Sequence, residues 1–184
     1  MNAVPLVIVA VVMSLGMQPA PKPAPPPQPV KPVTLNVEIV VGAQENLAAT
    51  CKKGGVNPST VFVVSAKQVF HCIGNSLHDH ANHGKDPDLE KAVVRLSAGD
   101  RVRWFSTRRF FVASVERHEL PGVTPPKKNL APASPFAAAL PKEYRTEVIS
   151  PPVRDEPGTI VQRYKASFNI EGVGLIDPDL ICSM

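Results

Sequence analysis

Proline restricts what this 184-residue chain can fold into more than any other feature, because its 21 prolines are concentrated in two segments. Eight of them lie between Pro19 and Pro32, and nine lie between Pro121 and Pro157. Proline fixes φ and has no amide hydrogen to donate, so it is excluded from helix interiors and from central strands. The first segment is therefore expected outside the folded domain, and the second is expected as a long, irregular connection.

The first 32 residues precede the domain, which we expect over residues 33–184. Residues 4–17 carry no charge, and this run is shorter than the roughly 20 apolar residues of a membrane span. It fits the apolar region of a secretory signal, so residues 1–20 are interpreted as a signal peptide or an uncleaved N-terminal anchor. Residues 18–32 are expected to be a semi-rigid linker of polyproline II geometry, and the alternative is a disordered tail that has no function. Together these features predict an exported protein that is periplasmic, secreted or membrane-tethered.

Within the domain, the pattern of apolar side chains predicts strands rather than helices. Alternate residues are apolar from Val33 to Val41, which is the two-residue period of a half-buried strand. A second strand is predicted where apolar residues alternate with mostly polar ones, at Ile160, Tyr164, Ala166, Phe168 and Ile170. No window has a convincing 3.6-residue period, although one helical turn is expected at Ala137–Leu140. Short strands separated by turns indicate an all-β sandwich or barrel. The further expected strands are Val61–Phe70 as one strand or a pair, Ala92–Leu96, Arg101–Phe105, Arg109–Val115 and Tyr144–Ile149, with a polar, turn-rich stretch from Gly74 to Asp88.

Two motifs in the second half of the chain indicate a more specific fold. The run GDRVRW at residues 99–104 is a turn and a strand, with Val102 and Trp104 facing one side. The run YKASF at residues 164–168 is a second strand, joined through a glycine-containing turn to IDPD at 176–179. Over about half of the chain, these motifs resemble cupredoxin-like domains, in particular small exported bacterial proteins without type 1 copper ligands. The resemblance implies a Greek-key β-sandwich with Trp104 in its core.

The resemblance does not extend to the copper site of that family. A blue-copper site needs two histidines, a cysteine thiolate and usually a weakly bound methionine. In the family, the cysteine, the second histidine and the methionine lie around the last hairpin. Here His118 is the last histidine and could occupy the place of the first ligand, but only Cys182 and Met184 remain after it. The resemblance therefore implies the fold without electron-transfer copper.

Histidines are concentrated in one stretch that the resemblance does not explain. His71 precedes Cys72, and His78, His80 and His83 follow. In an extended chain His78 and His80 would face the same side, whereas on a helical turn His80 and His83 would be neighbours. Imidazole suits Zn and Cu, so His78, His80 and His83 are the predicted metal ligands, with His71 as a further candidate. The alternative interpretation is a polar surface loop, because glycine and asparagine are frequent in this stretch.

The chain has three cysteines, Cys51, Cys72 and Cys182. Disulfides persist in the oxidising compartments that an exported protein reaches. Three pairings are possible, and each leaves one thiol over. A single bridge from Cys72 to either Cys51 or Cys182 is expected. The alternative is that all three are buried as small apolar side chains.

Composition and motifs narrow the function by exclusion. The formal net charge is +4, but lysine and arginine are dispersed without a long basic run, so no nucleic-acid partner is expected. The sequence contains no nucleophile elbow and no phosphate-binding glycine loop, and no enzymatic activity is expected.

We therefore predict an exported, non-enzymatic binding or structural module of the cell envelope. Its partner would be an unknown envelope protein or surface, contacted through residues 121–157, because loops on a rigid scaffold often carry recognition. It would touch a membrane only through an uncleaved N-terminal segment. The alternative is a metal-binding or metal-handling protein that uses residues 71–83 to hold Zn or Cu.

Overall fold

The computed structural model describes residues 31–82, 85–118, 134–154, 163–177 and 182–183. Of residues 117–118, 163 and 182–183 it describes the backbone only. The N-terminal segment expected over residues 1–20 and most of the linker expected over residues 18–32 lie outside these ranges. In the described part of the chain, no helix is both long and apolar enough to cross a membrane.

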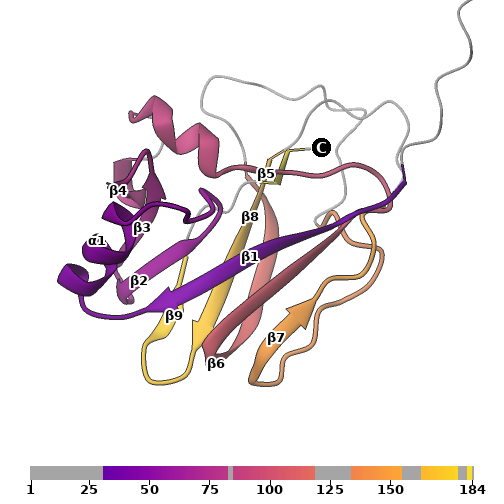
Figure 1. Ribbon diagram of the computed structural model, residues 1–184. Coiled ribbons are helices and arrows are strands. Elements are labelled where there is room, and N and C mark those ends of the chain that lie inside the picture. The colour runs from indigo at the N-terminus through magenta and orange to yellow at the C-terminus, as the bar shows by residue number, and fades with distance from the viewer. Residues whose placement is uncertain (1–30, 83–84, 119–133, 155–162, 178–181, 184) are drawn as a thin grey trace, which may run out of the picture. The chain divides into compact units, whose positions relative to one another are not determined.

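The described residues form a mostly β structure with few helices (Figure 1). The described ranges contain ten strands, one α-helix and two short 3₁₀ segments, η1 and η2. The strands are β1 (Thr34–Val41), β2 (Val61–Ser65), β3 (Gln68–Ile73), β4 (Ser76–Asp79), β5 (Val94–Arg95), β6 (Arg101–His118), β7 (Arg145–Ile149), β8 (Arg163–Ile170), β9 (Gly174–Ile176) and β10 (Cys182–Ser183). The helical segments are α1 (Gln44–Lys52), η1 (His80–Asn82) and η2 (Pro87–Ala92).

The strands form a mixed sheet in the order β4-β3-β2-β1-β6-β8-β10-β5, with β7 beside β6 and β9 beside β8. Strand β1 is parallel to both of its neighbours, β2 and β6. Parallel strands need a crossover connection, commonly a helix, and α1 lies in the connection from β1 to β2. Helix α1 is not among the elements that the sequence predicted. Helix α1 has little sequence signature, because it is short, buries only Leu47 and Cys51, and has Ala43 as its N-cap residue, which offers no side-chain cap.

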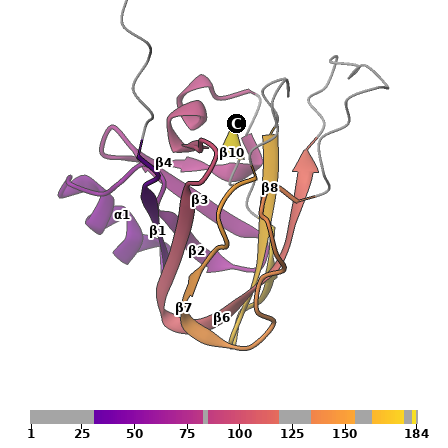
Figure 2. The same ribbon diagram turned by 90° about the vertical axis from the view of Figure 1, so that its right-hand side faces the viewer.

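Strand β6 is one continuous strand where two were expected, over Arg101–Phe105 and Arg109–Val115. Its first part pairs with β1 and β7, and from Phe110 onward it pairs with β8. The register with β7 shifts between Phe105 and Phe110, and Phe110 pairs with both β7 and β8. Figures 1 and 2 show β6 beside β1 and then beside β8. A single strand thus joins the two halves of the sheet.

One hydrophobic core contains inward-facing side chains from both halves of the sheet. Val37 and Ile39 of β1 share it with Phe168 and Ile170 of β8, and each is almost fully buried. Trp104 packs edge-to-face against Phe136 and Phe168, with ring centroids 5.9 and 6.0 Å apart. The predicted burial of Val102, Trp104, Tyr164, Ala166, Phe168 and Ile170 is confirmed.

The turn before β6 shows why the motif begins with Gly-Asp. Gly99 has a φ of +86°, which side chains other than glycine rarely adopt, and a Cβ there would come within 3.0 Å of Pro32. The buried carboxylate of Asp100 accepts hydrogen bonds from the amides of Val33 (2.9 Å) and Ser97 (2.8 Å). The turn therefore holds the start of β1 beside the start of β6.

Other expected elements differ in detail. The strand at Tyr144–Ile149 is confirmed as β7, but no helical turn forms at Ala137–Leu140. The strand expected over Ala92–Leu96 contains only the two residues of β5, because η2 extends to Ala92. The turn-rich stretch from Gly74 contains β4, which pairs with β3 as a hairpin.

Candidate functional site

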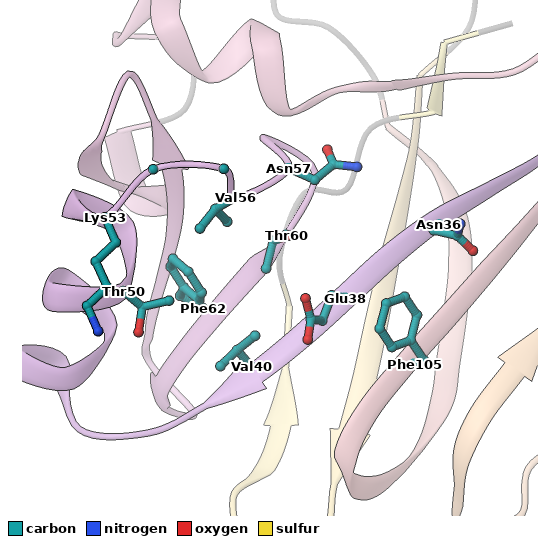
Figure 3. A pocket seen from close by; sticks show the side chains of 12 residues that line it. Asn36, Glu38, Val40, Thr50, Lys53, Val56, Asn57, Thr60, Phe62 and Phe105 are labelled. Carbon is teal, nitrogen blue, oxygen red and sulfur yellow. The ribbon is translucent and has the colours of Figure 1, made fainter.

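The outer face of the sheet carries a groove beside helix α1. Its floor comes from residues of β1 and β6 that point away from the core, because alternate residues of a strand face opposite sides. Asn36, Glu38 and Val40 belong to β1, and the strand register places Glu38 beside Phe105 of β6. Figure 3 shows the carboxylate of Glu38 near the middle of the groove and the ring of Phe105 at one end.

The opposite wall is built by the last turn of α1 and the loop that follows it. Gly54 and Gly55 in this loop both have a φ of +77°, so the chain turns there in a conformation that suits glycine. The groove is partly open and encloses about 520 Å³, within the range of about 300–1,000 Å³ that is typical of small-molecule sites. The residues that line it are Asn36, Glu38, Val40, Thr50, Lys53, Gly54, Gly55, Val56, Asn57, Thr60, Phe62 and Phe105.

A disulfide holds this wall in place. Cys51, in the last turn of α1, is bonded to Cys72 of β3, with the two Cα atoms 5.6 Å apart. Leu47, Phe62 and Phe70 pack around the bridge in a second small core. The bridge predicted from Cys72 is thus present, and Cys51 is its partner.

The ionisable side chains on the groove are free of partners, whereas those just outside it are paired. Among the described residues, neither Glu38 nor Lys53 makes a side-chain hydrogen bond or an ion pair. Arg103 instead lies over the Phe105 ring, 5.0 Å from its centroid, and pairs with Glu147. The hydrogen bond of this pair raises the pKa of Arg103 and lowers the pKa of Glu147. The groove therefore presents one carboxylate and one ammonium group.

The predicted histidine cluster is divided into two separate contacts. His71 of β3 and His80 of η1 are buried, and His71 Nε2 lies 3.3 Å from His80 Nδ1. His78 of β4 is the register partner of His71, but its Nδ1 lies 2.6 Å from Oδ2 of Asp86. His83 lies outside the described residues. Of the predicted ligands His78, His80 and His83, the two described ones thus contact different partners: His80 contacts His71, and His78 contacts the carboxylate of Asp86.

His78 belongs to a group of three potential ligands. One ligand atom from each of His78, Asp86 and Asp88 lies within 4.8 Å of the others, and all three residues are half-buried. Asp86 begins η2 by accepting a hydrogen bond from the amide of Asp88 (3.0 Å), and Asp88 pairs with Lys91. The hydrogen bond from His78, helped by that amide, lowers the pKa of Asp86.

Neither Asp86 nor Asp88 was predicted as a ligand from the sequence. The only sequence sign of them is the run Asp86-Pro87-Asp88, in which an aspartate before a proline indicates the start of a helical turn. That sign concerns chain geometry and does not point to His78, which is eight residues away.

In cupredoxins, copper binds near the positions of His118 and the last hairpin. For His118 and Cys182 the structure describes the backbone only. His118 pairs with Arg163 of β8, and on the other side of β8 Cys182 pairs with Tyr164.

Comparison of the chain with family models, with curated proteins and with solved structures finds no match.

Proposed function

We propose that this protein is a non-enzymatic ligand-binding module that is exported from the cell and binds its ligand in the groove beside α1. The observation that carries the proposal is the unpaired carboxylate of Glu38 on the floor of a groove of ligand size. Glu147, the carboxylate just outside the groove, is already paired with Arg103. Glu38 is thus available to a molecule from outside.

The composition of the groove favours binding over catalysis. General acid–base and nucleophilic catalysis need a reactive group placed next to a second group that activates it. The groove lining contains one carboxylate, Glu38, and one amine, Lys53, among amides, hydroxyls and apolar side chains. This set is suited to holding and orienting a ligand.

The disulfide supports export. Structural disulfides are rare in reducing compartments and common in exported proteins. The bridge between Cys51 and Cys72 agrees with the apolar N-terminal segment and with the proline-rich linker that follows it. We therefore place the groove in the periplasm or outside the cell, either free or tethered through the N-terminal segment.

We also propose that the fold is a cupredoxin-like Greek-key sandwich without electron-transfer copper. The support is the place of the two motifs that carry the resemblance. Trp104 and Phe168 meet in the core, and the Gly99–Asp100 turn ties β6 to β1. Since no histidine follows His118, the chain lacks the late ligand that type 1 copper needs.

The groove proposal is tested by mapping binding without assuming a ligand. A mixture of small neutral, cationic and anionic fragments is added to ¹⁵N-labelled protein, and amide shifts are followed by NMR. Shifts are expected at Val40, Val56 and Phe105, and they should weaken in Phe105→Leu. The matched control is Phe111→Leu, which changes a half-buried phenylalanine on the same strand but outside the groove. Shifts confined to other surfaces, or none, would contradict the proposal.

A second candidate function is metal binding at His78, Asp86 and Asp88, favoured by the proximity of their ligand atoms. One imidazole and two carboxylates form a donor set that suits Zn²⁺. The ion would take the place of the hydrogen bond between His78 and Asp86. Lys91, which pairs with Asp88, would have to release it.

Titration calorimetry with Zn²⁺ and Cu²⁺ on tag-free protein separates this site from the histidine set expected from sequence. One equivalent should bind, and binding should be lost in His78→Ala and in Asp88→Asn. His83→Ala, the matched control, should bind as the wild type does. Loss of binding in His83→Ala would favour the histidine-rich loop instead, and no binding at all would end the metal candidate.

A further inference from the structure

The charge of the groove limits the ligands that it can hold. Glu38 and Lys53 are the two ionisable groups of the lining, and their charges are opposite. Just outside, Arg103 and Glu147 also cancel each other. The groove is therefore close to neutral overall. A strongly cationic or anionic ligand would meet one favourable and one unfavourable charge, whereas a neutral ligand meets no such penalty.

The polar groups of the lining include both donors and acceptors. Glu38 can only accept hydrogen bonds and Lys53 can only donate them, whereas the side-chain amide of Asn36 can do both. The hydroxyl of Thr50 donates to the carbonyl of Asn46 (2.9 Å), and it keeps its capacity to accept. A ligand that complements this mixture needs several groups that can each donate and accept, and hydroxyl groups have that property.

The remaining requirement is an apolar surface, and Phe105 supplies it. Its ring stands at one end of the groove (Figure 3), is half-buried, and is held on one side by the guanidinium of Arg103. An aromatic face is electron-rich and attracts weakly positive C–H groups. Val40, which is half-buried, extends this apolar surface along the floor. A molecule with hydroxyl groups on its rim and C–H groups on its ring face would fit both parts.

We propose that the groove binds a neutral saccharide, with a sugar ring against Phe105 and vicinal hydroxyls donating to the carboxylate of Glu38. This inference rests on the proposed function, since it names the ligand class of the same groove. The saccharide is either a free oligosaccharide or a unit of an insoluble polysaccharide, and the recognising chemistry is the same for both.

The experiment uses the full-length protein and three neutral trisaccharides, which are maltotriose, cellotriose and N,N′,N″-triacetylchitotriose. Chitotriose, which has the same backbone with three free amines, is the cationic counterpart. Binding is followed by amide shifts in ¹⁵N-labelled protein, and sedimentation with amylose, cellulose and chitin tests the polymers. Sedimentation with a polymer points to a polysaccharide, and binding of the trisaccharide alone points to a free sugar. Either result supports the inference.

At least one neutral trisaccharide is expected to bind and to shift the amides of Val40, Val56 and Phe105. Glu38→Gln should weaken binding about tenfold, the size expected for losing one charge-assisted hydrogen bond. Phe105→Leu should weaken it to a similar degree. The matched controls are Glu116→Gln and Phe111→Leu, which change the same residue types on β6 outside the groove, and they should bind as the wild type does.

Three results would overturn the inference. They are no binding of any neutral trisaccharide, tighter binding of chitotriose than of its acetylated form, and unchanged affinity in Glu38→Gln. If the fragment mixture still maps to the groove while the sugars do not bind, the saccharide inference fails and the proposed function stands. If neither binds there, both fail.

Discussion

Strand β3 separates two covering segments that are held in different ways. On one face, Phe70 and Cys72 pack against Leu47 of α1, and the disulfide to Cys51 makes that attachment covalent. On the other face, Ile73 packs against Leu89 and Ala92 of η2. No disulfide attaches η2 to β3 among the described residues. The N-cap residue of η2, Asp86, is hydrogen-bonded to His78.

Because of this difference, the attachment of α1 should respond to reduction of the disulfide and the attachment of η2 should respond to pH. The α1 attachment depends on oxidation and does not depend on protonation, since disulfide cysteines do not titrate. The η2 attachment depends in part on the carboxylate of Asp86, whose pKa is lowered by its hydrogen bond to His78. The proposed groove lies on the covalently held side, where α1 forms a wall, and the candidate metal ligands lie on the titratable side.

Removing the covalent attachment should have the largest effect. In Cys51→Ala/Cys72→Ala the unfolded chain regains the freedom of a loop closed between residues 21 positions apart. The free energy of unfolding should fall by about 3 kcal/mol, measured by urea denaturation. Wild-type protein with reductant should behave in the same way. Equal stability of the variant and the oxidised wild type would show that α1 is held by packing alone.

Weakening the titratable attachment should have a smaller effect that depends on pH. Asp86→Asn keeps an acceptor for the amide of Asp88 but loses the charge that His78 contacts. Because the pKa of Asp86 is lowered from its ordinary value of 3.8, its contribution to stability is fully present above that value. It is lost as the pH falls through the lower pKa of the folded state.

Thermal unfolding between pH 2 and pH 7 measures this contribution. Asp86→Asn should melt below the wild type at neutral pH and should approach it in acid. The double cysteine variant should instead lie below the wild type by a similar amount across this range. If the melting temperature of Asp86→Asn differs from that of the wild type by the same amount at every pH, the hydrogen bond to His78 does not stabilise the η2 side.

The smallest effect is expected at the groove itself. Glu38 is exposed and has no partner among the described residues, so Glu38→Gln should change the free energy of unfolding by less than about 0.5 kcal/mol. Urea denaturation would show this. A larger fall in the free energy of unfolding would mean that Glu38 stabilises the sheet. The binding tests would then need a different variant at this position.

The sequence predicted the inside of the sheet better than its outside. The alternation through β8 identified Tyr164, Ala166, Phe168 and Ile170 as buried, because a strand with one apolar face repeats every two residues. The same reasoning could not show that β6 is continuous, since its two parts differ in pairing and in register. Helix α1 was missed because only Leu47 and Cys51 of its nine residues are buried.

The candidate site was predicted only in part. The histidine stretch was visible, but Asp86 and Asp88 meet His78 through the fold of the loop between them. No feature of the sequence indicated the groove, because its lining comes from β1, β2, β6, α1 and the loop after α1, and each contributes only a few residues.

By itself the sequence predicted the β class of the domain and the buried face of β8, since these follow from local periodicity, and it left a bridge from Cys72 as one of several alternatives. The tertiary structure decided that β1 is parallel to both neighbours, that Cys51 is the bridged partner, and that His78 and His80 make separate contacts. These results depend on which distant segments come together. Local spacing carries no information on that choice, because it depends on how the whole core packs.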